Sequence, residues 1–226
     1  MLKDQILFED NHLLIINKKS GQIVQGDKTG DISLVDEVKS YIKEKYAKPG
    51  KVFVGLVHRI DRPTSGIVIF AKTSKALSRL TEMLKKREIT KTYWAVVKKT
   101  DIPETQRLVH YLKKNEKNNK AIVYKRPTEG AKEAILTYRI IKQSENYLLL
   151  EVDLETGRHH QIRAQLSAMG IPVKGDLKYG FERSNLDGSI HLLARKIEFL
   201  HPVKKEKIIL TAPVPQNDNL WKSFEE

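Results

Sequence analysis

One carboxylate, Asp61, lies among basic side chains in the nine-residue stretch 58–66, which reads His-Arg-Ile-Asp-Arg-Pro-Thr-Ser-Gly. The apolar runs 52–57 and 67–71 on either side are short and rich in β-branched residues, so they predict two strands. The proline fixes its own φ and the glycine permits a φ that other residues avoid, so the stretch between the strands predicts a loop. Such a loop suits a binding or catalytic group, because its strands are rigid while its side chains face outward.

Asp61 has three interpretations from the local sequence. It could form a surface salt bridge with Arg59 or Arg62, a common contact of small energetic value. It could belong to a protein kinase catalytic loop, but Ile60 separates its Arg from its Asp, and the other kinase motifs are missing from the sequence. It could also be a carboxylate nucleophile or base whose charge neighbouring cations stabilise.

The composition favours a soluble globular protein with a polyanionic partner. The 226 residues are 40% hydrophobic and 31% charged, and the formal net charge is +13, which indicates nucleic acid before membrane. Without cysteine the chain can form neither a disulfide nor a Cys-ligated zinc site. Charged residues interrupt the amino terminus, and no apolar run reaches the length of a membrane span, so we expect a cytoplasmic protein.

Hydrophobic periodicity predicts two helices and a series of strands. One helix should start at Asp31 as its cap, and a second should be capped by Thr73 or Ser74. Strands are expected at 13–16, 91–97, 108–112, 121–124, 134–141 and 147–154, and the last four predict an antiparallel meander. The lysine-rich stretch 113–120 is expected to be a basic hairpin tip, either contacting phosphates or merely solvated.

A second dense cluster, 155–163, precedes a helical stripe that Gly170 should end as a carboxyl-terminal cap. Arg163 falls at the border of the apolar face of this helix, where it could reach inward to a carboxylate. His159 and His160 suggest a metal site, but adjacent residues on a helix point about 100° apart. No carboxylate or third histidine follows at ligand spacing, which disfavours metal.

These clusters together resemble the RluA-type pseudouridine synthases over nearly the whole chain. The stretch 58–66 is similar to the family's catalytic motif, whose Asp is the catalytic residue and which usually has Leu where Ile60 stands. Lys91-x-Tyr93 matches the second motif, whose Tyr lies against the target base. The stretch 157–163 resembles the third, Gly-Arg-Thr-His-Gln-Ile-Arg, with His159 in place of the Thr.

The resemblance implies an α+β fold with a central mixed, largely antiparallel sheet flanked by helices and a basic active-site cleft. It implies one catalytic domain over residues 1–226, without the extra amino-terminal RNA-binding domain of some members. The implied reaction turns uridines of ribosomal or transfer RNA into pseudouridine, with no cofactor and no metal. Asp61 would be the catalytic carboxylate, Tyr93 would stack on the base and help to transfer protons, and Arg163 would pair with Asp61.

The target uridine must leave its stack, and Arg59 resembles the family residue that fills the vacated space. The expected partner is a structured RNA stem-loop, with no membrane, no obligate protein partner and a monomeric chain. Two other functions remain open: a non-catalytic RNA-binding module or chaperone, and an RNA hydrolase or nuclease using His159 and His160. The residues expected to bind substrate are His58, Arg59, Ile60, Arg62, Lys91, Arg158 and Gln161.

Overall fold

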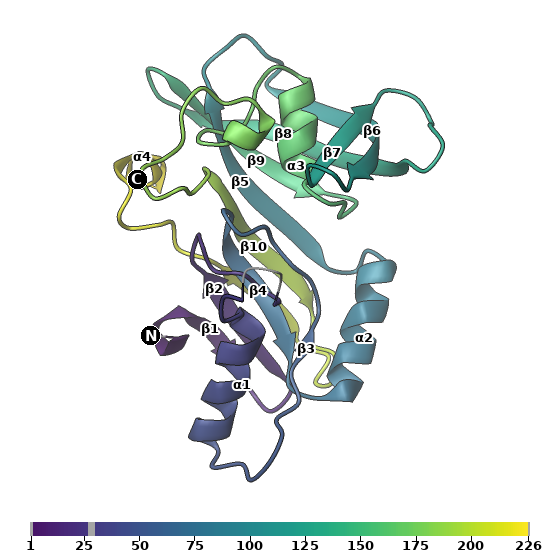
Figure 1. Ribbon diagram of the computed structural model, residues 1–226, viewed down its shortest axis with the longest axis vertical. Helices are drawn as coiled ribbons and strands as arrows, with labels where there is room; N and C mark the ends of the chain where they lie inside the picture. Colours follow the sequence, from purple (N-terminus) through teal and green to yellow (C-terminus); the bar gives the residue numbers. More distant parts are fainter. Residues whose placement is uncertain (1, 27–29, 226) are drawn as a thin grey trace. The chain divides into compact units, whose positions relative to one another are not determined.

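The computed structural model describes residues 2–26 and 30–225 and divides the chain into two compact units (Figure 1). The first unit contains residues 1–89 and 194–213, and the second contains residues 90–193 and 214–226. Asp61 therefore belongs to the first unit, and Tyr93 and Arg163 belong to the second. The expected single domain over residues 1–226 stays a prediction.

The first unit combines a sheet with two helices (Figure 1). Its elements after a short 3-10 helix at Leu2–Gln5 are β1 Ile6–Glu9, β2 Leu13–Lys18, α1 Leu34–Lys45, β3 Gly55–Leu56, β4 Ser65–Ala71, α2 Ser74–Lys85, β10 Leu192–Leu200 and β11 Lys207–Thr211. The strands follow the order β1-β2-β4-β10, while β3 pairs with β4 and β11 pairs with β10. The first two residues of β10 belong to the second unit.

The centre of this sheet is the antiparallel pair β2 and β4, in which Leu13 lies opposite Ala71 and Lys18 opposite Gly66. Every residue of β4 is buried, and the apolar run at the start of β2 is fully inaccessible. Burial on both faces suits continuous β-branched and aliphatic runs. The strands predicted at 13–16 and 67–71 are confirmed.

Side-chain caps start both helices. Ser33 precedes α1 with an extended backbone, and its hydroxyl accepts a hydrogen bond from the Asp36 N–H at 3.4 Å. The prediction that Asp31 caps this helix is wrong, because Ser33 is the residue directly before the first helical turn. Thr73 precedes α2 and accepts a hydrogen bond from the Ala76 N–H at 3.2 Å, as predicted.

The strand expected at 52–57 shrinks to the two residues of β3. Gly55 and Leu56 pair with Ala71 and Phe70 at the end of β4, whereas Phe53 is 46% exposed. β10 also lies beside β4 in the strand order. The run 52–57 has strand propensity, but only Gly55 and Leu56 pair with β4 as a strand, and Val57 adds a single N–H bond to the Ile69 carbonyl.

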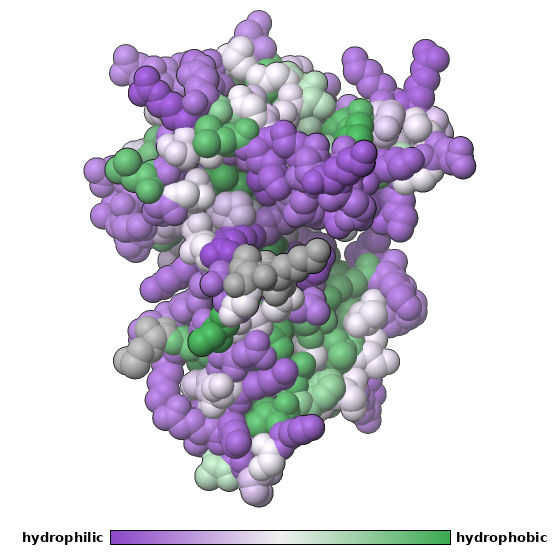
Figure 2. Space-filling model, viewed as in Figure 1, coloured by the Kyte–Doolittle hydropathy of each residue, from purple (hydrophilic) through white to green (hydrophobic). Residues whose placement is uncertain are grey.

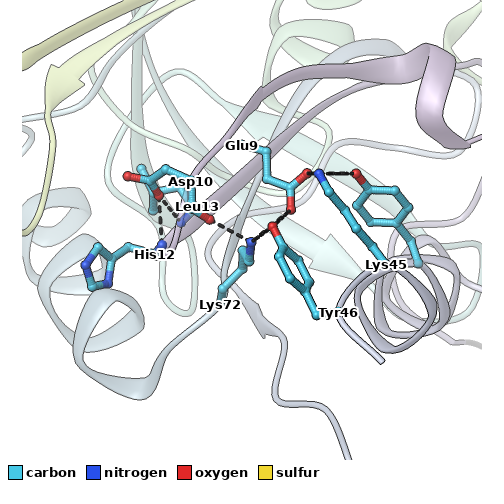
Figure 3. A network of polar contacts seen from close by, with 8 residues as sticks. Glu9, Asp10, His12, Leu13, Lys45, Tyr46 and Lys72 are labelled. Atoms are coloured by element: carbon cyan, nitrogen blue, oxygen red, sulfur yellow. Dashed lines mark hydrogen bonds and ion pairs between the residues drawn. The ribbon is translucent and has the colours of Figure 1, made fainter. Parts of the chain in front are cut away.

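A polar network anchors α1 to the end of β1 (Figure 3). The carboxylate of Glu9 accepts hydrogen bonds from Tyr41, Lys45 and Tyr46 at 2.7 Å and from Lys72 at 2.9 Å. Burial raises the pKa of Glu9, but these bonds outweigh it and lower the pKa to about 2. One carboxylate therefore joins a strand, a helix end and the residue that follows β4.

Replacing Glu9 with Gln should destabilise the protein by about 2–3 kcal/mol at neutral pH, because charged hydrogen bonds are lost. The folded-state pKa lies below its usual value of 4.5. The stabilisation is therefore complete above about pH 4.5 and is lost as the pH falls toward about 2. Denaturant unfolding of wild type and Glu9→Gln across this pH range measures the stabilisation by Glu9. Glu44→Gln, on the exposed side of α1, is the control. Equal acid sensitivity of wild type and Glu9→Gln would contradict it.

The second unit is a five-stranded antiparallel sheet with helices. Its elements are β5 Thr90–Lys98, β6 Thr105–Asn115, β7 Lys120–Tyr124, β8 Lys132–Gln143, β9 Tyr147–Leu154, α3 Gln161–Ala168, the 3-10 helix Leu177–Tyr179 and α4 Asn219–Glu225. The strand order is β5-β9-β8-β6-β7. Residues of α3 and the 3-10 helix pack on β6, β7 and β8 through a small core of Leu112, Ala121, Ala134, Ala164 and Tyr179.

The four strands predicted to form a meander exist and pair antiparallel, but they are not a consecutive meander. β8 pairs with β6 rather than with β7, which pairs only with the carboxyl-terminal part of β6. The cause is length, because β6 is long enough to take β7 along Tyr111–Asn115 and β8 along its other edge at Thr105–Leu112. The α+β class is confirmed. No helix in residues 2–26 and 30–225 is long and apolar enough to span a bilayer.

Candidate active site

The loop that carries Asp61 connects β3 to β4 and turns tightly just after Asp61. The Asp61 carbonyl accepts a hydrogen bond from the Thr64 N–H at 3.0 Å, and the Asp61 side chain is half-buried. Gly66 follows at φ +112°, and a Cβ there would lie 2.4 Å from the Ala194 carbonyl oxygen of β10. Only glycine fits this position, so the sequence fixes how the loop enters β4.

A buried lysine holds this loop from the end of β2. Lys18 is 0% exposed, and its Nζ donates hydrogen bonds to the carbonyls of Lys19 at 3.0 Å, Gln22 at 2.9 Å and Arg62 at 3.1 Å. Three acceptors match the three N–H groups of an ammonium. Burial lowers the pKa of Lys18 to about 7, while the nearby Asp61 carboxylate raises it. Lys18 is thus coupled to Asp61 both through the loop backbone and electrostatically.

The end of β2 and the turn after it, residues 18–22, form a segment that we name the brace. It makes two more contacts with the same loop. The Gly21 N–H donates to the Arg62 carbonyl at 2.9 Å, and the Ser20 hydroxyl donates to the Pro63 carbonyl at 3.0 Å. The brace therefore fixes the two residues that directly follow Asp61. The sequence alone assigned these residues no role.

Replacing Lys18 with Met should lower stability by about 2–4 kcal/mol, because it removes the charged donor of three hydrogen bonds to carbonyl groups of the brace and the loop. The unfolding free energy measures this, and turnover should fall with it, since the Asp61 loop is no longer held. Lys19→Met is the matched control, because Lys19 is adjacent but exposed. A Lys18→Met protein as stable and active as Lys19→Met would refute the role of Lys18.

The other predicted residues of this motif have different environments. His58 Nε2 accepts a hydrogen bond from the Ile69 N–H of β4 at 3.3 Å, and Ile60 is 8% exposed. Arg59 is exposed, and Arg62 is exposed with an ion pair to Asp31 at 2.9 Å. The structure thus places the two arginines at the surface around Asp61, while His58 and Ile60 face inward. Substrate binding by these four residues stays a prediction.

In the second unit, Lys91 and Tyr93 lie two residues apart on β5 and so on one face of the sheet. Tyr93 is 8% exposed. A Cβ at Gly157 would lie 3.4 Å from the Lys91 Nζ, so this ammonium sits beside the loop that leads into α3. The second and third sequence motifs are therefore adjacent in space within this unit.

Arg163 reaches inward from α3 to a buried carboxylate, as its position on the helix predicted. Its Nε and Nη2 donate to the two carboxylate oxygens of Asp176 at 2.7 Å and 2.8 Å. Arg163 is 4% exposed and Asp176 is 1% exposed, and the guanidinium lies 5.1 Å from the centre of the Tyr179 ring. Sequence reasoning missed Asp176. The expected pairing of Arg163 with Asp61, in the other unit, stays a prediction.

The turn that precedes α3 is fixed by Gln161, which is 3% exposed. Its Oε1 accepts hydrogen bonds from the Thr156 hydroxyl at 2.8 Å and the Arg158 N–H at 2.9 Å, and its Nε2 donates to the Ile135 carbonyl at 3.0 Å. The Arg158 guanidinium donates to the Glu133 carbonyl at 2.7 Å and is exposed. Gln161 thus shapes the turn, and Arg158 remains accessible to a ligand. Substrate binding by both stays a prediction.

The two adjacent histidines stack on each other with ring centres 3.8 Å apart. His160 takes a left-handed backbone conformation before α3, and its Nδ1 lies 2.9 Å from the Tyr179 hydroxyl. That hydroxyl also accepts the Ala121 N–H at 2.7 Å, so Tyr179 links His160 to β7. In residues 2–26 and 30–225, no group of three His, Cys, Asp or Glu side chains is placed to hold a metal ion.

Comparison with known proteins identifies the family. The model of the family described as RNA pseudouridylate synthase matches residues 12–168, a stretch that contains the loop of Asp61, β5 and α3. The chain belongs to the RNA pseudouridylate synthase family. Its resemblance to pseudouridine synthases, inferred from three motifs, is confirmed.

Curated relatives carry the same family description. The chain is 35% identical over 217 residues to an uncharacterised RNA pseudouridine synthase of Synechocystis, covering 93% of this chain and 65% of that protein. It is 33% identical over 225 residues to ribosomal large subunit pseudouridine synthase C of Buchnera aphidicola, covering 95% of this chain and 68% of that protein. The chain thus spans about two thirds of the length of these relatives.

The fold has a solved counterpart within the same family. Human RNA pseudouridylate synthase domain containing 4 superposes with a TM-score of 0.79 at 23% identity, covering 96% of this chain and 90% of that one. The likeness supports the fold of the pseudouridylate synthases for this chain. Together with the two α+β units, it confirms the fold class expected from the sequence.

Proposed function

We propose that this chain is an RNA pseudouridine synthase that isomerises specific uridines in ribosomal or transfer RNA. Family membership supports this function, and the name of the Buchnera relative supports ribosomal RNA as the substrate. The observation that carries the proposal is the Asp61 loop, a half-buried carboxylate whose two following residues are held by the brace. A carboxylate held rigidly at a loop is suited to covalent or electrostatic catalysis.

The reaction breaks the bond between ribose C1′ and uracil N1 and forms a bond between C1′ and C5. C5 loses its proton and N1 gains one, so no electrons, groups or cofactors enter or leave. Asp61 acts as the nucleophile at C1′ or stabilises the sugar cation that develops there. Tyr93 stacks against the uracil while it turns, and Arg163 serves as the ion-pair partner of Asp61.

The RNA has to present the target uridine outside its stack, which costs a few kcal/mol. Arg59 is exposed, and its planar guanidinium can stack in the place that the base leaves. The net charge of +13 attracts the phosphate backbone, and hydrophilic side chains cover most of the visible face of the second unit (Figure 2). We propose further that the protein acts as a cytoplasmic monomer without cofactor, metal or obligate protein partner.

The test is conversion of uridine by the purified protein. Unmodified ribosomal RNA and transfer RNA transcripts are incubated with the protein, and pseudouridines are mapped afterwards. Mapping in total RNA from cells with and without the gene then identifies the natural site. An RNA-binding module or chaperone would bind these RNAs but form no pseudouridine in either experiment, and a nuclease would cut the strand.

A further inference from the structure

Lys91 is a partly buried cation whose charge nothing in the described structure balances. It lies on β5, and burial is the cause that lowers its pKa. Within residues 2–26 and 30–225, no hydrogen-bond acceptor or carboxylate is paired with its Nζ. An ammonium withdrawn from water without a partner is destabilising. The presence of Lys91 despite this loss of folding stability suggests a ligand that supplies the missing negative charge.

The other lysines in comparable surroundings have acceptors. Burial lowers the pKa of Lys18 and Lys174 as well. Lys18 donates to three carbonyl oxygens, and Lys174 donates to the Asn185 side chain at 2.8 Å. Lys91 is the exception among these three. The unpaired ammonium is therefore a property of its site rather than of buried lysines in this chain.

The surroundings of Lys91 leave space for an anion. The residue beside its Nζ is Gly157, where a methyl group would lie only 3.4 Å away. Glycine therefore keeps this side of the ammonium open. Lys91 and Tyr93 project from the same face of β5, with Cα atoms about 7 Å apart along the strand. A nucleotide whose base contacts Tyr93 would bring its own or a neighbouring phosphate into this region.

We propose that Lys91 binds a phosphodiester oxygen next to the target uridine, with Gly157 leaving the space for that phosphate. The proposal rests on the proposed function, because it takes RNA as the ligand. A phosphodiester fits better than a uracil carbonyl, because its full negative charge balances the positive charge of the ammonium. The contact would hold the target nucleotide while its base is cut and turned.

The first measurement is the salt dependence of RNA binding. Lys91→Met should raise the Kd about tenfold near 100 mM salt and reduce the slope of log Kd against log salt by about 0.7–0.9, the value for one phosphate contact. Lys91→Arg should restore the slope. Lys98→Met is the control on the same strand, because Lys98 is exposed and paired with Glu182 at 2.7 Å. Melting curves verify that each variant is folded.

A second variant keeps the charge and removes the space. Gly157→Ala adds a methyl group beside Nζ at a position whose φ is not left-handed, so the backbone remains unstrained. RNA binding should weaken severalfold while the melting temperature stays unchanged. Binding equal to wild type would contradict the placement of the phosphate beside Gly157.

The third measurement locates the phosphate. Two RNAs each carry one neutral methylphosphonate, either on the 5′ or on the 3′ side of the target uridine. One of them should bind wild type more weakly but bind Lys91→Met unchanged. The other should affect the binding of both proteins equally. The proposal fails if each methylphosphonate RNA affects the binding of wild type and Lys91→Met equally. It also fails if Lys91→Met lowers turnover without changing the salt slope, which would indicate a contact with the base. Wild type that forms no pseudouridine would instead refute the proposed function.

Discussion

Asp61→Asn should reduce pseudouridine formation more than about a thousandfold, to below detection, while the fold and RNA affinity stay near wild type. The substitution keeps the size of the side chain and removes only the anion. The described contacts that shape the loop, from Thr64 and the brace, use main-chain carbonyls, so the loop should keep its conformation. Single-turnover conversion of a verified substrate measures the loss, with melting curves and RNA binding measured in parallel.

Asp31→Asn is the matched control for this variant. It also removes a carboxylate that faces the loop, but Asp31 is half exposed and pairs with Arg62 at the surface. An exposed pair contributes little, so Asp31→Asn should retain nearly full activity. Substantial product from folded Asp61→Asn would overturn the assignment of the essential carboxylate.

Arg163→Met should abolish activity and also destabilise the protein by about 3–5 kcal/mol, because it leaves the buried carboxylate of Asp176 unpaired. Loss of activity in this variant alone would therefore not prove a catalytic role. Arg163→Met combined with Asp176→Leu should separate the two effects. Replacing both partners of a buried pair with apolar groups is often neutral, so stability should return while activity does not.

Thermal unfolding and single-turnover rates of the wild type, both single variants and the double variant are the measurements. Activity that recovers with stability would show that Arg163 is needed only for the fold. If Arg163 acts through Asp61, adding Arg163→Met and Asp176→Leu to Asp61→Asn should lower the rate little further, because the anion it serves is already gone. A further large loss would contradict the ion pair expected between Asp61 and Arg163.

Features encoded by a few neighbouring residues could be predicted from the sequence. The strand at 67–71, the cap at Thr73 and the helix end at Gly170, which has φ +79°, follow from β-branched runs, a hydroxyl before a helix and a left-handed glycine. The inward reach of Arg163 followed from its position beside the apolar stripe of α3.

Features that depend on distant partners could not be predicted in this way. β3 keeps only the two residues that pair with Phe70 and Ala71 at the end of β4, although the whole run 52–57 has strand propensity. In the sequence, Lys18 stands beside a second lysine and resembles part of a solvated turn. One of its acceptors, the Arg62 carbonyl, is 44 residues away, so the neighbouring residues do not reveal the contact. The ion pair of Asp176 with Arg163 likewise depends on a tertiary contact, because it forms only when the 3-10 helix that follows Asp176 packs near α3.

The brace holds positions 62 and 63 by their carbonyl oxygens, and every residue type has a carbonyl. Substituting the side chain at position 62 would therefore leave the position of Asp61 unchanged. A loop built in this way separates two requirements: where the reactive carboxylate stands, and which chemical groups are offered to the RNA beside it. Changes in target preference at position 62 could then accumulate without a loss of catalytic geometry, and a library varied only at that position should remain folded.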